Sequence, residues 1–235
     1  MNKKLVFAAL GMFSASVLFA ADGDAKAEVK AAAKKVGSNY SWTSTPKTEG
    51  GSGGGGNFRA GPTDGQTADG VVYLKSTFGE RTMESAAKGG KVAFKGEDGW
   101  ETADDQAQGP GQFMARRMAT FKAPAAEAGD LADKTKALKS ADGVISGDLT
   151  EEGAKELLSF GRRVNPDRPA PKEAKGSVKF WIKDGALTKY EYNVQGKVTG
   201  REDAEVSVNR TTTVEIKDVG TTKLTLSDEA KKKLS

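Results

Sequence analysis

Apolar and polar residues alternate with period two along the last quarter of the chain, residues 176–235. Two runs, 178–182 and 190–194, each carry their apolar residues on one face, as strands do when they bury one side of a sheet. Asp184-Gly185 lies between these runs and is a two-residue β-hairpin signal. The pattern therefore predicts an antiparallel meander.

A third run, 204–216, is the longest uninterrupted alternation in the chain. Every even position in it is apolar or threonine, apart from Arg210. A strand of this length spans about 40 Å, and long antiparallel strands curl. Such strands suit a barrel or a half-barrel wrapped around something.

The first half of the chain carries shorter extended runs, separated by turn dipeptides such as Asp64-Gly65 and Gly89-Gly90. Residues 50–56 are nearly pure glycine and predict a flexible loop tip between two strands. A phosphate-binding loop is disfavoured there because no Gly-Lys-Ser/Thr follows. The strands expected from these patterns are residues 39–48, 57–60, 70–78, 81–88, 91–95, 100–102, 144–149 and 224–226.

Helices are expected at both ends and in the middle. Residues 24–36 are rich in alanine and lysine and stop at Gly37, and Ser227 is placed to cap a terminal helix. Residues 112–121 predict a helix ended by Pro124, residues 131–139 predict a weaker one, and Thr150 caps a third.

Two of these helices carry apolar stripes. Met114, Met118 and Phe121 recur at helical spacing with Phe113 beside them, while Arg116 and Arg117 fall mostly on the other side. The Thr150 helix has a stripe that includes Leu157 and Leu158. These stripes are interpreted either as helix faces packed on the sheet or as a lid over an apolar groove, to which methionine adapts well.

Trp181 shares a strand with Val178, Phe180 and Ile182 but lies on the opposite face. Either that strand is buried on both sides, or one side lines a cavity. Trp42 and Trp100 are open to the same two interpretations, as core residues or as stacking platforms.

The first twenty residues predict a secretory signal peptide. Lys3 and Lys4 are followed by an apolar run and then by small residues, so we expect cleavage near Ala20 and a single domain over residues 21–235. The run is short for a membrane span of roughly 20 residues. The chain has no cysteine, which excludes disulfides and a thioether-linked lipid. The predicted location is the periplasm or the extracellular space.

Composition limits the available chemistry. Without histidine or cysteine, a Ser-His-Asp triad, a Cys-His pair and zinc sites built from these residues are excluded. Carboxylate pairs such as Glu97-Asp98 and Glu151-Glu152 leave a carboxylate-dependent hydrolase as one alternative. The net charge of +4 falls to +2 without Lys3 and Lys4, and the basic residues are dispersed, which disfavours nucleic-acid binding. No cofactor and no metal site are predicted.

Three segments carry a family resemblance: Lys88-Gly-Gly-Lys-Val-Ala-Phe through Asp98-Gly-Trp-Glu-Thr, Lys179-Phe-Trp-Ile-Lys-Asp-Gly, and residues 212–223 with the Ser-Asp-Glu-Ala-Lys-Lys-Lys-Leu that ends the chain. With the layout of helix, meander, interposed helices and long meander, the chain resembles uncharacterised secreted members of the periplasmic lipoprotein-carrier superfamily, the LolA/LppX-like fold. The resemblance implies an α+β fold: one curved antiparallel sheet, a half-barrel of about 9–11 strands, with helices covering its concave face. Characterised members hold acyl chains between sheet and helices.

The predicted function is therefore non-enzymatic binding of a lipid, a lipoprotein or another apolar ligand in a groove between sheet and helices. The alternative is an envelope sensor or interaction module that binds a protein partner. The candidate groove residues are Phe113, Met114, Met118, Phe121, Leu157, Leu158, Phe160, Trp181, Tyr190 and Tyr192.

Overall fold

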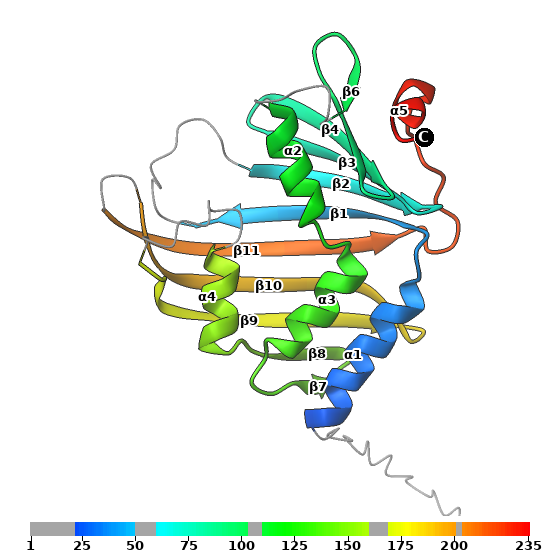
Figure 1. The fold of residues 1–235 in the computed structure, drawn as a ribbon. Helices are drawn as coiled ribbons and strands as arrows, with labels where there is room; N and C mark the ends of the chain where they lie inside the picture. Colours follow the sequence, from blue (N-terminus) through cyan, green and yellow to red (C-terminus); the bar gives the residue numbers. More distant parts are fainter. Residues whose placement is uncertain (1–21, 50–59, 103–109, 160–168, 201–203) are drawn as a thin grey trace, which may run out of the picture.

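The computed structural model describes residues 22–49, 60–102, 110–159, 169–200 and 204–235, without the side chains of residues 22, 23, 60 and 110–114. Within these ranges one open antiparallel sheet of 11 strands has the order β6-β5-β4-β3-β2-β1-β11-β10-β9-β8-β7 (Figure 1). The strands are β1 (Tyr40–Thr48), β2 (Ala60–Ala68), β3 (Val71–Phe78), β4 (Arg81–Lys88), β5 (Lys91–Lys95), β6 (Trp100–Thr102), β7 (Lys139–Ala141), β8 (Val144–Asp148), β9 (Lys172–Lys183), β10 (Ala186–Thr199) and β11 (Glu205–Lys217).

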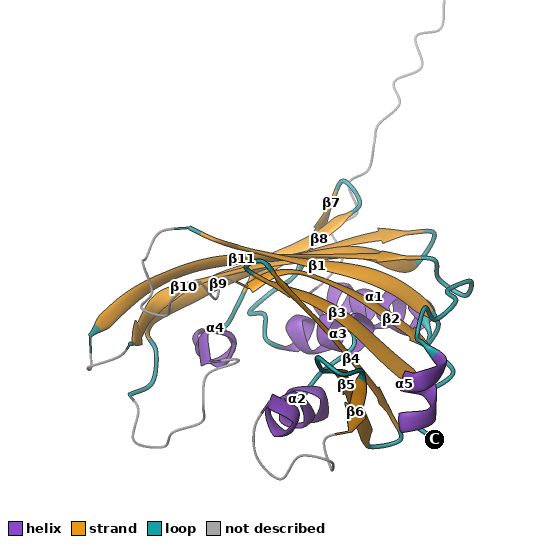
Figure 2. Cartoon of the chain, turned by 90° about the horizontal axis from the view of Figure 1, so that it is seen from above, coloured by secondary structure: helices purple, strands orange, loops and turns teal. Residues whose placement is uncertain are grey.

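Four helices lie on the concave side of this sheet, which is curved when seen edge-on (Figure 2). They are α1 (Asp22–Val36), α2 (Pro110–Ala119), α3 (Pro124–Asp133) and α4 (Glu151–Ser159). A short fifth helix, α5 (Asp228–Lys233), lies apart from them beside β5 and β6. The predicted class, an α+β fold with one curved antiparallel sheet and helices on its concave face, is confirmed.

The long meander forms as its alternation predicts. Asp184 and Gly185 have φ angles of 53° and 73°, the left-handed conformation that a tight hairpin between β9 and β10 needs. Phe180 is paired with Tyr190, and Val178 with Tyr192, so the apolar faces of the two strands coincide. β11 then pairs with β1, so the first and last strands of the chain lie side by side in the middle of the sheet.

The turn expected at Asp64-Gly65 is wrong, because both residues lie inside β2. Gly65 sits opposite Trp42, and a Cβ atom built on it would fall 2.1 Å from the indole ring. The glycine therefore makes room for a tryptophan on the neighbouring strand, which is a second reason for glycine to interrupt a strand pattern.

Two helix boundaries also differ from expectation. Pro124 does not merely end the preceding helix: it is the first residue of α3, where its missing N–H costs nothing, and α3 ends at Asp133.

The strand expected at residues 224–226 does not form. Both expected caps are confirmed, since Thr150 Oγ1 accepts from the Gly153 N–H at 3.0 Å and Ser227 Oγ from the Ala230 N–H at 3.2 Å.

The apolar core is divided between the two faces of the sheet. The larger cluster lies on the concave side beneath the helices. A smaller one, which includes Trp100 and Tyr73, is covered by Ala230 and Leu234 on the other face. Of the three tryptophans, Trp42 and Trp100 are therefore core residues.

Candidate functional site

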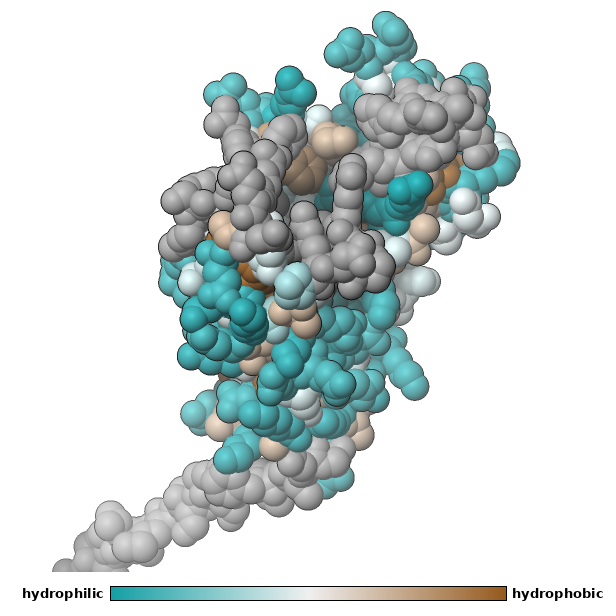
Figure 3. Space-filling view, turned by 60° about the vertical axis from the view of Figure 1, so that its left-hand side comes forward, coloured by the Kyte–Doolittle hydropathy of each residue, from teal (hydrophilic) through white to brown (hydrophobic). Residues whose placement is uncertain are grey.

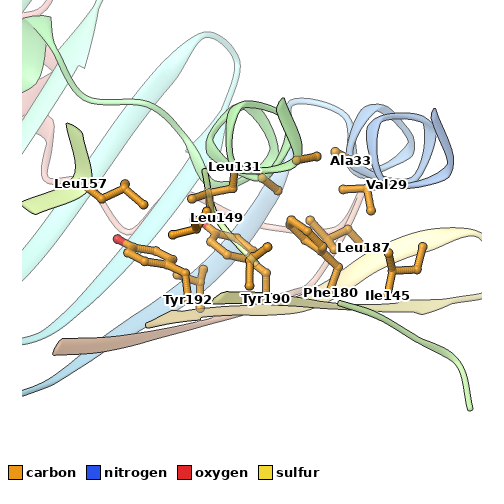
Figure 4. Packing of buried hydrophobic residues seen from close by; sticks show 14 of the residues in the cluster. Val29, Ala33, Leu131, Ile145, Leu149, Leu157, Phe180, Leu187, Tyr190 and Tyr192 are labelled. Atoms are coloured by element: carbon orange, nitrogen blue, oxygen red, sulfur yellow. The ribbon is translucent and has the colours of Figure 1, made fainter. Parts of the chain in front are cut away.

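The concave face has a closed half, under α1 and α3. These two helices pack against each other as well as on the sheet. Beneath them Phe180, Tyr190 and Leu187 are each 0% exposed, and Leu131 on α3 is 2% exposed (Figure 4). Side chains fill this space, so it is a packed core.

A buried carboxyl group lies in the closed half. Glu127 on α3 accepts a hydrogen bond from the Tyr190 hydroxyl, and the Tyr192 hydroxyl is 3.5 Å from its other oxygen. Burial raises the pKa of Glu127, although the two hydroxyls favour the ionised form. The same burial, with Glu127 beside it, raises the pKa of Tyr190. The group fastens α3 to β10 through polar contacts within an apolar layer.

The other half of the concave face lies under α4 and α2, and each of these helices covers a different part of the sheet. α4 packs on β9 and β10, and α2 on β4 and β5. Between α4 and the sheet several side chains are slightly open: Leu157 and Tyr192 are each 9% exposed, Ala174 8% and Val198 6%, whereas Leu158 is 4% and Ala154 0% exposed. Figure 3 brings this end forward and shows apolar residues surfacing in small patches among hydrophilic ones.

Gly196 on β10 allows α4 to approach the sheet closely, and Gly176 on β9 makes room for Leu149, which precedes α4. A Cβ atom on Gly196 would lie 2.7 Å from Leu158 Cδ1, and one on Gly176 would lie 2.8 Å from Leu149 Cδ1. At the end of α4, Arg210 from β11 donates a hydrogen bond to the Leu157 carbonyl oxygen at 2.8 Å. Arg210 thus satisfies a carbonyl that the helix leaves free and places its charge favourably at the helix C-terminus.

The part of the floor beneath α2 is polar. Ser76 and Ser85 are buried on β3 and β4, and Ser85 Oγ lies 3.5 Å from Met118 Sδ. Arg117 points to the same floor: its Nη2 is 3.4 Å from Ser76 Oγ and its Cζ is 5.1 Å from the centre of the Phe78 ring. The expectation that Arg117 lies away from the sheet is therefore wrong, because its long side chain folds back beneath the helix.

The predicted groove residues fall into three groups. Met118, Phe121, Leu157, Leu158, Tyr190 and Tyr192 belong to the concave cluster, and Phe121 stacks on Trp42 with ring centres 6.1 Å apart. Trp181 is on the opposite face, with Lys189 Nζ 4.6 Å from its ring, so it does not line the concave side. The side chains of Phe113 and Met114, and all of Phe160, lie outside the described residues.

Three charged residues at this face, Glu127, Arg117 and Arg210, were not among the predicted site residues. Each is a single ionic residue in a polar or mixed segment, and only the tertiary contact makes it distinctive. Arg210 alone left a trace in the sequence, as the one charged residue at an even position of the 204–216 run.

The carboxylate pairs are not brought together across a cleft. Glu97 and Asp98 are exposed in the turn between β5 and β6, at one edge of the sheet, while Glu151 and Glu152 are exposed at the start of α4, over β9 and β10. Glu151 pairs with Lys155 at 2.7 Å. Over the described residues no group of acidic side chains is arranged to hold a metal ion.

No protein-family profile matches the chain, and no curated protein matches it in sequence. Among solved structures, the chain is similar to the lipoprotein LppX of Mycobacterium tuberculosis, with 11% identity and a TM-score of 0.43 over 88% of this chain and 100% of that one. It is also similar to LprF of Mycobacterium bovis, with 8% identity and a TM-score of 0.42 over 89% of this chain and 99% of that one. These likenesses concern the course of the backbone, and the function proposed below rests on the side chains of this chain.

None of the helices within the described ranges has the length and apolar character needed to cross a membrane. The predicted signal peptide, residues 1–20, lies outside those ranges.

Proposed function

We propose that this chain is an exported, non-enzymatic protein that binds an apolar chain, such as the acyl chain of a lipid or lipoprotein, between the sheet and its helices. The binding place is the half of the concave face under α4 and α2. The observation that supports it is the contrast in cover: α1 and α3 pack against each other over a filled core, whereas α4 packs chiefly on the sheet, and several of the side chains there are still 6–9% exposed.

The magnitudes favour exchange of α4 for a ligand. α4 presents two leucines, Leu157 and Leu158, to the sheet, and burying each is worth about 1.5–3 kcal/mol. A long acyl chain offers on the order of 10 kcal/mol at about 0.8 kcal/mol for each buried methylene, before ordering costs. An acyl chain therefore offers a gross burial energy larger than that of the two leucines it would displace from the same apolar floor.

The first test is native mass spectrometry of the protein purified from envelope extracts. The proposal expects a co-purifying apolar molecule in stoichiometric amount, released by organic solvent. A chain that always emerges empty, and that fails to take up oleate when it is offered, would contradict the proposal.

A disulfide lock tests the place of binding. The chain has no cysteine, so Leu158→Cys with Gly196→Cys supplies the only pair, at positions that face each other: a Cβ atom on Gly196 would lie 2.7 Å from Leu158 Cδ1. In the oxidised protein α4 is fixed to β10, and we expect uptake of oleate to be lost. Reduction of the same sample restores uptake, which separates locking from misfolding. Equal uptake in both forms would place the ligand elsewhere.

A further inference from the structure

Arg117 lies in the half of the concave face under α4 and α2, in surroundings that favour binding of an anion. Its guanidinium is half-buried, between the Phe78 ring and the buried Ser76 hydroxyl. None of the ion pairs among the described residues includes it. Burial lowers the pKa of Arg117, and within the described ranges no carboxylate offsets this effect. A guanidinium that has lost water without gaining a counter-charge is a costly arrangement.

The other arginine of this face has a role that Arg117 lacks. Arg210 donates to the end of α4 at 2.8 Å and so serves the fold. Among the residues that the structure describes, the guanidinium of Arg117 contacts a hydroxyl, at the long distance of 3.4 Å, and the face of an aromatic ring. Most of its five N–H donors are thus left for another partner.

We infer that Arg117 binds the anionic oxygen group, carboxylate or phosphate, of an amphipathic ligand whose apolar chain lies on the concave face. This inference rests on the proposed function and adds the class of ligand to it. A guanidinium presents paired donors that match the two oxygens of a carboxylate or phosphate, and Phe78 and Met118 beside it offer apolar contact to the first methylenes. A neutral alcohol of the same length would leave the charge unpaired.

Oleate and oleyl alcohol test this, because they differ only in the end group. Both are titrated against the protein with bound 1-N-phenylnaphthylamine, a neutral fluorescent probe, at pH 7.5 and low salt. Arg117→Gln is the test variant. Arg116→Gln is the matched control, since it removes the same charge from the neighbouring, exposed position of α2. Thermal unfolding of each variant verifies its fold.

The inference expects the wild type to prefer oleate over oleyl alcohol by about tenfold or more, the size of a charged hydrogen bond. Arg117→Gln abolishes the preference and leaves the affinity for the alcohol unchanged, while Arg116→Gln retains the preference. A structural role for Arg117 would weaken both ligands alike.

Equal binding of the two ligands by the wild type would overturn the inference, even if Arg117→Gln failed to fold, and would leave the proposed function standing. An unchanged preference in Arg117→Gln would overturn it in the same way. If the wild type binds neither the probe nor either ligand, the proposed function fails, and the inference fails with it.

Discussion

The two halves of the concave face share β9 and β10, and the half under α2 adds β4 and β5, yet the halves differ in what lies on these strands. Under α1 and α3 the strands present large rings, Phe180 and Tyr190, that the helices cover completely. Under α4 and α2 the strands present glycines, a threonine, serines and Arg210, to which α2 adds Arg117. α4 rests chiefly on the sheet and contacts Lys134 at the end of α3. The half under α1 and α3 therefore contributes most to the stability of the fold. The half under α4 and α2 is less tightly packed, as access for a ligand requires. The predictions below test this division, from the largest expected effect to the smallest.

Gly65→Leu should abolish the folded state or cost more than about 4 kcal/mol in the free energy of unfolding. The added side chain would begin 2.1 Å from the Trp42 ring, where β1 and β2 are bound into the sheet and cannot move apart. Urea denaturation followed by tryptophan fluorescence measures the effect. A stable, native-like variant would mean that Trp42 can leave its place without loss.

Leu131→Ala and Leu157→Ala form a matched pair, one on α3 and one on α4. We expect Leu131→Ala to lower the free energy of unfolding by about 3 kcal/mol, because it leaves a cavity in a filled layer. Leu157→Ala should cost less, about 1–2 kcal/mol, because its site is partly open and can collapse. Equal costs, measured by urea denaturation, would erase the distinction between the halves.

Glu127→Gln probes the polar contact in the closed half through its pH dependence. The folded-state pKa of Glu127 is raised above its unfolded value, so the folded state holds this proton more tightly. Its contribution to stability is complete below the unfolded pKa, near 4.3, and is lost as the pH rises through the folded pKa. A glutamine side chain does not ionise, so the variant does not lose this stability as the pH rises.

We therefore expect Glu127→Gln to gain stability relative to the wild type between about pH 4 and neutral pH. Lys122, Asp130 and the hydroxyls of Tyr190 and Tyr192 also surround this carboxyl group, and they stay in place in the variant. The measurement is the difference in free energy of unfolding across a pH series. A difference that does not vary with pH would show that Glu127 does not titrate between the two states.

Gly129→Ala gives the smallest effect, and it stabilises the folded state. Gly129 lies within α3, and a Cβ atom on it would meet nothing within 4 Å. Alanine is a better helix former by about 0.5–1 kcal/mol, so the variant should be more stable by that amount. No change in ligand uptake is expected, because α3 belongs to the closed half. A fall in melting temperature would contradict this.

The alternation of residues 176–217 predicted the strongest part of the fold, because period two fixes which side chains share a face and Asp184-Gly185 fixes the turn. Gly65 was misread because glycine signals a turn as readily as a close contact with a ring on another strand. Pro124 was misread because the same residue can end one helix and begin the next.

The site was less accessible to sequence reasoning. Stripes such as Leu157-Leu158 predict that a helix packs on something, but they do not say whether the packing is tight or leaves room. Arg117 and Glu127 look like ordinary surface residues in the sequence, and only the strands opposite them reveal that their side chains turn toward the sheet. Trp181 shows the converse, since an aromatic residue on a sheet strand faced away from the helices.

Amide hydrogen exchange with and without oleate tests the central claim most directly, because it reads the opening of each helix separately. The account predicts that α4 exchanges through a local opening whose free energy is far below that of global unfolding, whereas α1 and α3 exchange only near the free energy of global unfolding. It also predicts that oleate slows exchange in the ends of β10 and β11 that lie under α4. Exchange of α4 at the same slow rate as α3, unaltered by oleate, would contradict it.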